Sequence, residues 1–175
     1  MLIREKGLTG TSFGDVIDHS GAPRGSIYHH FPGGKTQLVE DAVRYAGDYI
    51  NASIDRAAQD GDPVKVLRAF TASWRRVLED SDFRAGCPVV AVAVEAHEGD
   101  SALTGAVADV FARWQTSLFE LLRANAVPEA RARSLATTMV AAIEGAVVLC
   151  RATRSVQPLT DVGGEMEKLL RDALA

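Results

Sequence analysis

Residues 22–36 (APRGSIYHHFPGGKT) contain several side chains whose types and spacing could support chemistry. The adjacent His29 and His30 could ligate a metal ion, and the Gly-Gly-Lys-Thr run could hold a phosphate group. The same residues could instead contact DNA, since they include cationic and hydrogen-bonding side chains in a short span. Each possibility requires a particular spacing and a particular surrounding structure.

The spacing argues against a nucleotide-binding loop at residues 33–36. A phosphate loop has the pattern G-x-x-x-x-G-K-[ST] and follows a hydrophobic strand. Here the residue six positions before Lys35 is His29 rather than glycine, and the preceding segment has a helical pattern. We therefore expect no nucleotide site in this stretch.

The spacing also argues against a metal or catalytic site. Side chains of adjacent helical residues point about 100° apart, so His29 and His30 cannot share one ion. Glu95 and His97 are the remaining candidates for enzymatic chemistry, but they lack the histidine pair, four residues apart, of a zinc protease helix. The two cysteines have neither CxxC nor Cys/His ligand spacing. We therefore expect no enzymatic activity, no metal and no cofactor.

The composition is that of an ordinary globular chain with a local charge bias. Of the 175 residues 47% are hydrophobic and 24% are charged, and the formal net charge is −4. No uncharged apolar run approaches the roughly 20 residues of a membrane span, so we expect a cytoplasmic protein with reduced cysteines and no membrane contact. Between Asp18 and Glu40 there is no acidic residue, whereas the segment holds Arg24, Lys35 and three of the four histidines. Such a segment favours contact with a polyanion.

Turn and cap signals predict two short helices on either side of Gly21. Ser12 and Asp15 have the spacing of a capping box at the start of the first helix. Gly21 can adopt the positive φ that ends such a helix. Pro23 suits the first turn of a second helix that ends before Pro32. Two short helices joined by a tight turn have the layout of a helix-turn-helix.

The rest of the sequence also has a helical pattern, so we expect an all-α fold. Apolar residues recur at helical spacing in segments that glycine and proline separate. The Val/Ala run at 88–97 also fits a buried strand, but we interpret it as a helix because no partner strand is predicted. The expected helices span residues 12–20, 23–31, 35–59, 63–79, 88–97, 101–126, 128–153 and 159–174.

The second short helix has a packing face and an outward face. Ile27 and Phe31 lie four residues apart and can pack on the first helix. The remaining positions then face outward: Arg24, Gly25, Ser26, Tyr28 and His29. Arginine can form two hydrogen bonds to guanine, the polar residues can bind phosphates or base edges, and Lys35 opens the next helix at an end that favours a phosphate. These residue types favour DNA binding, and a corner of a helical bundle with Tyr28 and Phe31 in its core is the alternative.

The stretch Thr11–Phe31 resembles the DNA-binding module of the TetR family of transcriptional repressors. The matching features are a Gly-x-x-x-x-[ST] entry at Gly7–Ser12, the turn at Gly21, and the pattern [KR]-G-[ST]-[IL]-Y-x-H-F at Arg24–Phe31. The Pro-Gly-Gly-Lys that follows, with a later Gly-Cys-Pro before the Val/Ala run, is similar to the LmrA/YxaF-type branch. The resemblance is strong over residues 5–45 and looser beyond them.

The resemblance implies an all-α homodimer with about nine helices in each chain. Residues 1–45 would form a three-helix DNA-binding domain with a truncated first helix, and residues 46–175 a ligand-binding and dimerisation domain. Carried over by position, the DNA contacts would be Ser12, Arg24, Gly25, Ser26, Tyr28, His29, His30 and Lys35. Family members usually carry further residues before the position of Met1, so we expect either a trimmed chain or a start upstream.

The C-terminal part has features of both an interface and a cavity. Residues 136–150 (ATTMVAAIEGAVVLC) are apolar on every side. This pattern favours one face on the chain's own core and another on a second subunit, or else the central helix of a monomeric bundle. Several residues could wall an apolar ligand cavity. These candidates are Phe70, Trp74, Cys87, Phe111 and Trp114.

Taken with the resemblance, these features predict a ligand-responsive transcriptional repressor. It would bind double-stranded operator DNA as a homodimer. A small hydrophobic or aromatic effector would release it by favouring a conformation in which the recognition helices have the wrong spacing. The alternative is a helical ligand-binding or interaction module with impaired DNA binding, for which the short N-terminal helix is the main argument.

Overall fold

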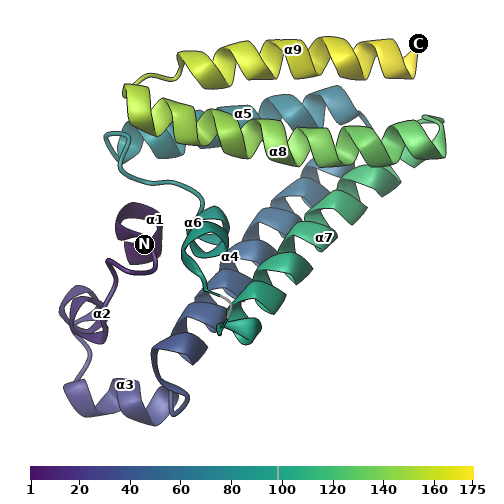
Figure 1. Ribbon diagram of the computed structural model, residues 1–175. Coiled ribbons are helices and arrows are strands. Elements are labelled where there is room, and N and C mark those ends of the chain that lie inside the picture. Colours follow the sequence, from purple (N-terminus) through teal and green to yellow (C-terminus); the bar gives the residue numbers. More distant parts are fainter. Residues whose placement is uncertain (98) are drawn as a thin grey trace. The chain divides into compact units, whose positions relative to one another are not determined.

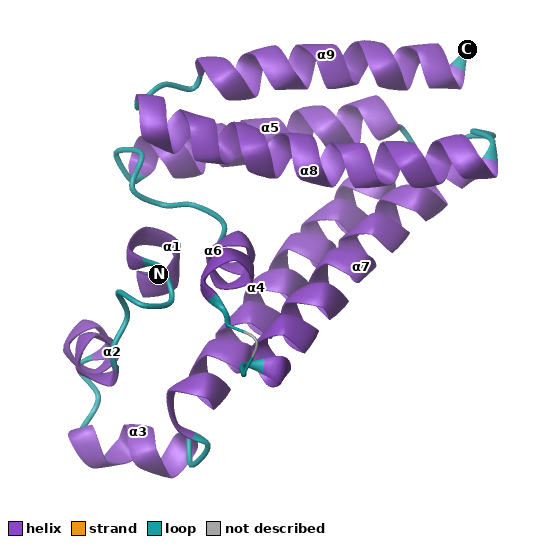
Figure 2. Cartoon of the chain, in the orientation of Figure 1, coloured by secondary structure: helices purple, strands orange, loops and turns teal. Residues whose placement is uncertain are grey.

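The computed structural model describes residues 1–97 and 99–175, and within them it contains nine α-helices and no β-strand (Figure 1). The helices are α1 (Leu2–Lys6), α2 (Phe13–Ser20), α3 (Arg24–His30), α4 (Gly34–Ala58), α5 (Pro63–Asp80), α6 (Pro88–Glu95), α7 (Ser101–Ala124), α8 (Glu129–Thr153) and α9 (Gln157–Leu174). Figure 2 shows that the connections between them are loops and turns. The predicted all-α fold class is therefore confirmed, and the Val/Ala run that also fitted a strand is helix α6.

The chain divides into two compact units. The N-terminal unit contains residues 1–48 and 87–110, and the C-terminal unit contains residues 49–86 and 111–175. Helices α4 and α7 each continue from one unit into the other, so the units share two helices. The functional division after residue 45 stays a prediction, since compactness alone does not define function.

Local sequence signals determine where the short helices of the N-terminal unit begin and end. The Ser12 hydroxyl accepts the backbone N–H of Asp15 at 3.1 Å, and the Asp15 carboxylate accepts that of Ser12 at 2.9 Å, which completes the predicted capping box. Gly21 ends α2 with a φ of 67°, in the left-handed region that favours glycine. Helix α3 follows and stops before Pro32. The predicted helix-turn-helix layout is therefore present in the structure.

Helices α5, α8 and α9 pack together within the C-terminal unit. Leu78, Leu135 and Leu170 come one from each of these helices, and their side chains are almost completely buried. Complete burial of one such side chain stabilises a fold by about 1.5–3 kcal/mol. The hydrophobic effect therefore holds these three helices together.

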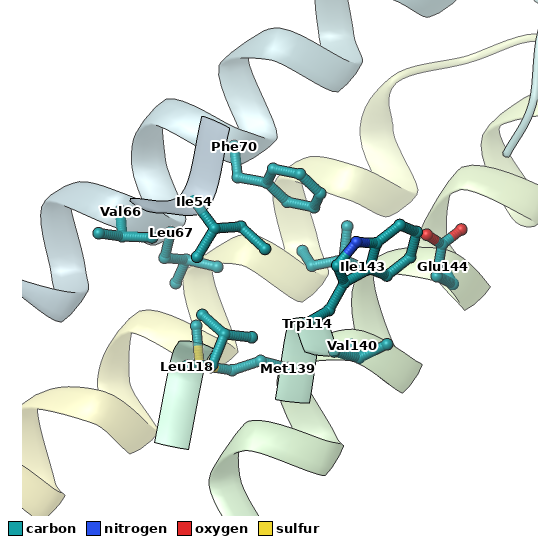
Figure 3. Close-up of a pocket in the computed structure, with 10 residues that line it drawn as sticks. All are labelled: Ile54, Val66, Leu67, Phe70, Trp114, Leu118, Met139, Val140, Ile143 and Glu144. Atoms are coloured by element: carbon teal, nitrogen blue, oxygen red, sulfur yellow. The ribbon is translucent and has the colours of Figure 1, made fainter. Parts of the chain in front are cut away.

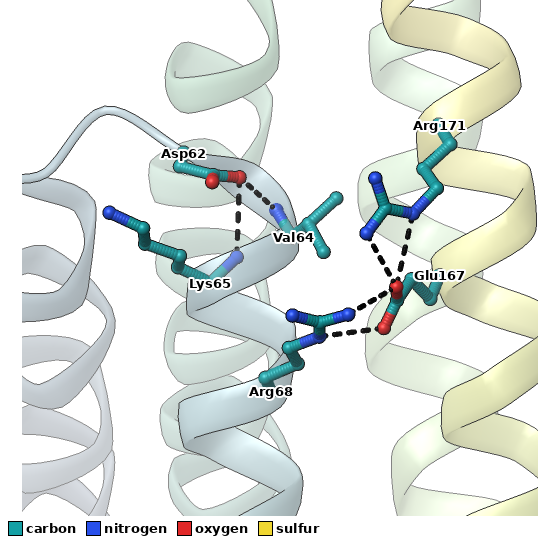
Figure 4. Close-up of polar contacts among 6 residues, drawn as sticks. All are labelled: Asp62, Val64, Lys65, Arg68, Glu167 and Arg171. Atoms are coloured by element: carbon teal, nitrogen blue, oxygen red, sulfur yellow. Dashed lines mark hydrogen bonds and ion pairs between the residues drawn. The ribbon is translucent and has the colours of Figure 1, made fainter.

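A charged cluster joins α5 to α9 within the same unit (Figure 4). The Arg68 guanidinium donates to both carboxylate oxygens of Glu167, at 2.8 and 2.6 Å, and Arg171 donates to the same carboxylate from the next turn of α9. These hydrogen bonds lower the pKa of Glu167 to about 2, and the largest contribution comes from Arg68. At the start of α5, the Asp62 carboxylate accepts two backbone N–H groups of the first turn and caps the helix.

Helix α8 is long and apolar enough to cross a membrane, judged by length and composition alone. The core helix of a soluble protein meets the same criterion. Two observations favour a core helix here. Ile143 and Val147 of α8 are buried within the unit, and Glu144 places an acidic group in the middle of the apolar run, which a bilayer disfavours.

Gly47 lies where α4 meets α7 within the N-terminal unit, and the contact is too close for a larger side chain. A Cβ atom added at Gly47 would lie 2.5 Å from Cγ2 and 2.8 Å from Cγ1 of Val110. Because overpacking a core costs about 1–3 kcal/mol, we expect Gly47→Ala to lower the free energy of unfolding by that amount in urea denaturation.

Gly105→Ala is the matched control on α7. A Cβ atom at Gly105 has no heavy atom of the described structure within 4 Å. Helix propensity favours alanine over glycine by about 0.5–1 kcal/mol, so this variant should be at least as stable as the wild type. Equal stability of the two variants would contradict the close approach of Gly47 to Val110.

Candidate functional site

Helix α3 carries the predicted DNA-contacting residues on its surface. The Ile27 side chain is 5% exposed and anchors the helix to the rest of the unit. Exposed positions are occupied by Arg24, Gly25, Tyr28, His29 and His30, and Ser26 is half-buried. The alternative that placed Tyr28 in a helical core is wrong, because 64% of this residue is exposed. Phe31, the other residue of that alternative, is half-buried.

The Tyr28 ring is supported by α2 although the residue is exposed. Its centroid lies 5.5 Å from that of Phe13, in an edge-to-face arrangement with an interplanar angle of 87°. Aromatic pairs of this kind contribute about 0.5–1.5 kcal/mol beyond the burial of their surface. The contact gives Tyr28 a defined position from which its hydroxyl can bond a phosphate.

The Ser12 hydroxyl is already engaged within the chain. It donates to the Asp15 carboxylate and accepts the Asp15 N–H, and Lys6 forms an ion pair with the same carboxylate at 2.5 Å. Hydrogen bonds from Lys6 and then from Ser12 hold the pKa of Asp15 well below its usual value. Ser12 therefore serves first as the cap of α2, and a phosphate would have to compete with Asp15 for its hydroxyl.

Glu95, at the end of α6, holds the loop between α1 and α2. Its two carboxylate oxygens accept the backbone N–H groups of Leu8 at 3.2 Å and of Thr9 at 2.8 Å. Gly7 has a φ of 76°, and a Cβ atom there would overlap the Glu95 carboxylate, so only glycine permits this approach. Hydrogen bonds from Thr9 lower the pKa of Glu95, with further contributions from Leu8 and from the charge of Lys35.

The contact of α6 with the first loop was not predictable from sequence pattern. From the sequence alone, Glu95 is a candidate only for enzymatic chemistry, and it lies 87 residues along the chain from Leu8. Lys35, the second residue of α4, is half-buried, and its charge acts on the Glu95 carboxylate. The predicted phosphate-binding lysine therefore already has a carboxylate near it within the N-terminal unit.

An apolar cavity lies within the C-terminal unit, between α4, α5, α7 and α8 (Figure 3). Its volume is about 30 Å³, which is enough for little more than a water molecule. The lining residues are Ile54, Val66, Leu67, Phe70, Trp114, Leu118, Met139, Val140, Ile143 and Glu144. The cavity is thus almost entirely apolar and has one acidic residue in its wall.

Two of the five predicted ligand-binding residues, Phe70 and Trp114, line this cavity. Trp74 and Phe111 do not line it but contact these two edge to face. The centroid distances are 6.4 Å from Trp74 to Phe70 and 5.4 Å from Phe111 to Trp114. Cys87 is buried and belongs to the N-terminal unit. Binding of a ligand by any of these residues stays a prediction. The aliphatic lining residues were not predicted, because their helical spacing is that of any core residue.

In the part of the chain that the structure describes, no three histidine, cysteine or acidic side chains form a group that could hold a metal ion. The rings of His29 and His30 stand edge to face with their centroids 5.4 Å apart. Both cysteines are buried, and burial raises the pKa of the Cys150 thiol. A buried thiol with a raised pKa is a poor nucleophile.

Comparison with protein families matches both parts of the chain. Residues 1–42 match the model of bacterial regulatory proteins of the tetR family. Residues 63–165 match the C-terminal domain of LmrA/YxaF-like transcriptional regulators. The second match alone covers more than half of the 175 residues.

Individual relatives agree with both matches. An HTH-type transcriptional regulator of Mycobacterium tuberculosis (strain H37Rv) is 42% identical over 175 residues, which cover 97% of this chain and 89% of the relative. The HTH-type transcriptional regulator LmrA of Bacillus subtilis is 32% identical over 171 residues, which cover 97% of this chain and 91% of LmrA.

Solved structures share the fold along almost the whole chain. A TetR-family transcriptional regulator from Agrobacterium tumefaciens has a TM-score of 0.82 at 26% identity and covers 95% of this chain and 90% of its own. The regulatory protein TetR from Rhodobacter sphaeroides has a TM-score of 0.85 at 23% identity, with coverage of 96% and 92%. The helix-turn-helix fold with a helical C-terminal part is therefore confirmed.

Replacing Glu95 by glutamine keeps its size but removes the charge that its hydrogen bonds to Leu8 and Thr9 depend on. A hydrogen bond to a charged group contributes about 1.5–3 kcal/mol, and less at a partly exposed site such as this one. We expect Glu95→Gln to lower the free energy of unfolding by about 1 kcal/mol at neutral pH. The amide protons of Leu8 and Thr9 should exchange faster in NMR-detected hydrogen exchange.

The effect of Glu95→Gln should depend on pH in a defined direction. The folded state lowers the pKa of Glu95 below its ordinary value of 4.5, so its stabilisation is present above that value and is lost as the pH falls through the folded-state pKa. The difference from the wild type should therefore shrink on acidification. Glu79→Gln, which changes an exposed acid of α5, is the control. A difference that stayed constant with pH would exclude a charge-dependent contact.

Proposed function

Since the chain belongs to the TetR family of bacterial regulatory proteins, we propose that it represses transcription by binding operator DNA as a homodimer and that a small lipophilic molecule releases it. Members of this family are DNA-binding regulators rather than enzymes. The observation that carries the proposal is the exposed face of α3, with cationic and hydrogen-bonding residues in a segment free of acids. We expect the protein to act in the cytoplasm, where bacterial operator DNA lies.

The exposed face of α3 has the chemistry to read a DNA groove. Arg24 opens the helix, and a guanidinium can form two hydrogen bonds to a guanine edge. At Gly25 no heavy atom of the described structure lies within 4 Å of a Cβ position, so a DNA backbone can approach closely. Tyr28 and His29 add hydroxyl and imidazole groups. The proposed contacts are Ser12, Arg24, Gly25, Ser26, Tyr28, His29, His30 and Lys35, with Ser12 acting mainly as the cap of α2.

An exposed stripe along α8 supports a homodimer. It consists of Thr138, Ala141, Gly145, Val148, Leu149 and Ala152. Apart from the adjacent Val148 and Leu149, these positions recur at intervals of three and four residues, so they lie along one side of the helix. Val148 and Leu149 are 51% and 52% exposed, and the small residues permit close approach of a second helix. A two-fold dimer would present two copies of α3 about one turn of DNA, roughly 34 Å, apart.

The small volume of the cavity and the helices that line it support a response to a ligand. Drug-sized ligands occupy about 300–1,000 Å³, far more than the cavity offers here, so a ligand would have to separate the helices around it. Ile54 of α4 and Trp114 and Leu118 of α7 line the cavity, and both helices continue into the N-terminal unit. A ligand that binds the opened conformation more tightly shifts the population away from the DNA-binding one.

Arg24→Ala tests whether α3 reads bases. We expect it to weaken binding to the selected operator by about 1–3 kcal/mol, while binding to random DNA changes little. Fluorescence anisotropy titrations at fixed salt measure both affinities after an operator has been selected from a random duplex pool.

Arg131→Ala, at an exposed position of α8, removes the same charge outside the proposed interface and should leave operator affinity unchanged. Equal losses in the two variants would show that net charge, and not base contact, is responsible. Failure of the wild type to select any sequence would favour the alternative of a helical module without DNA binding.

Val148→Asp tests the proposed dimer face. A charge at this position would be buried in a dimer at a cost of several kcal/mol, so we expect a monomer in sedimentation analysis and operator affinity reduced by about tenfold or more. Val94→Asp is the matched control, since Val94 is 79% exposed on α6, and it should stay dimeric. A dimeric Val148→Asp protein would rule out this face of α8.

A further inference from the structure

Two adjacent histidines occupy the end of the surface proposed to bind DNA. His29 and His30 are both exposed and lie in the last turn of α3, and the C-terminal end of a helix favours positive charge. Their ring centroids are 5.4 Å apart, and the ring planes differ by 72°. Each ring can therefore donate to a phosphate oxygen of its own.

Protonation changes what a histidine offers to DNA. The neutral imidazole has one N–H donor, whereas the protonated form has two donors and a positive charge. Histidine is also the side chain whose charge changes between about pH 5 and pH 8. Phosphate oxygens are negatively charged acceptors, so they bind the protonated form more tightly than the neutral one.

Acidic groups are scarce on the helices next to the pair. Helix α2 packs against α3, and α4 follows α3 in the chain. The titratable and charged side chains on α2, on the rest of α3 and on the first turn of α4 are Asp15, Asp18, His19, Arg24, Tyr28 and Lys35. The Asp15 carboxylate is held by Lys6 and Ser12, and no acid lies between Asp18 and Glu40. Asp18 is exposed to solvent, where ion pairs contribute little, so DNA phosphates are the stronger counter-charge for the two imidazoles.

We propose that operator binding takes up protons through His29 and His30, so that acidification tightens the complex. The inference rests on the DNA-binding function proposed above and adds a response to pH to it. Because the bound form holds more protons than the free form, the affinity rises as the pH falls through the range in which histidine titrates. A fall in pH would therefore strengthen repression without any organic ligand.

The pH dependence of operator affinity tests the inference. Fluorescence anisotropy titrations of the full chain at fixed salt use an operator selected from random duplexes at pH 7. We expect the wild type to bind this operator about tenfold more tightly at pH 6 than at pH 8. In the double variant His29→Asn/His30→Asn, the affinity should change by less than about twofold over the same range. His97→Asn removes an exposed histidine that follows α6, and this control should keep the wild-type pH dependence.

Salt dependence and a fixed charge provide two further readouts. Each imidazolium that contacts a phosphate should steepen the slope of log affinity against log salt by about 0.9. The wild-type slope should therefore be steeper at pH 6 than at pH 8, and the slope of the asparagine double variant should be the same at both. His29→Lys/His30→Lys carries the charge at both pH values, so it should bind at pH 8 about as tightly as the wild type does at pH 6. This variant keeps the test decisive if the asparagine variant binds no DNA.

Several results would overturn the inference. They are a wild-type affinity that is equal at pH 6 and pH 8, a pH dependence that survives in the asparagine or lysine double variant, and a pH dependence that His97→Asn removes. If the wild type binds an operator with the same affinity at both pH values, the DNA-binding function stands and the response to pH fails. If the wild type selects no operator at pH 6, 7 or 8, the DNA-binding function itself fails.

Discussion

Helix α3 is too short to be stable alone, and the N-terminal unit supplies what it lacks. Isolated helices of fewer than about 12–15 residues are marginal in water, and α3 spans Arg24–His30. Its support comes from the burial of Ile27, from the contact of Tyr28 with Phe13, and from the capped helix α2. The loop before α2 is held by the carboxylate of Glu95. The surface proposed to read DNA therefore depends on a side chain from a much later part of the sequence.

Helix α6, which carries Glu95, is one of the places where the chain passes from one compact unit to the other. Helix α6 begins at Pro88, two residues after residue 86, which is the last residue of one segment of the C-terminal unit. Helices α4 and α7 also run through the division between the units. Three connections of the chain thus lead from the unit that contains the cavity to the unit that carries α3.

The sequence predicted those features that depend on a few neighbouring residues. Capping by Ser12, the positive φ of Gly21 and the stop before Pro32 are local effects, and all are present. Contacts between residues far apart in the chain could not be predicted from the sequence in this way. Glu95 reaches its partners through the fold, and its value as a hydrogen-bond acceptor depends on the backbone of another loop.

Residue type predicted only some of the residues that line the cavity, because the lining depends on contacts between distant parts of the chain. Phe70 and Trp114 line it, whereas the equally aromatic Trp74 and Phe111 contact them without lining it. The helical spacing of these aromatic residues indicates that they pack against other helices, but it does not show which neighbour each one faces. The distinction comes only from the packing of four helices around one space.

The sequence pattern of helix α8 does not show which of its apolar residues are buried and which are exposed. Its apolar run serves a buried face that includes Ile143 and Val147 and also an exposed stripe that includes Val148. Glu144 adds a carboxylate to the wall of the cavity. Folding of one chain gains nothing from the exposed part of a valine side chain. The exposed stripe would be buried only against a second molecule, and a second subunit is the partner proposed for Val148. The composition of α8 therefore follows from what the helix is proposed to bind as much as from the core that it helps to form.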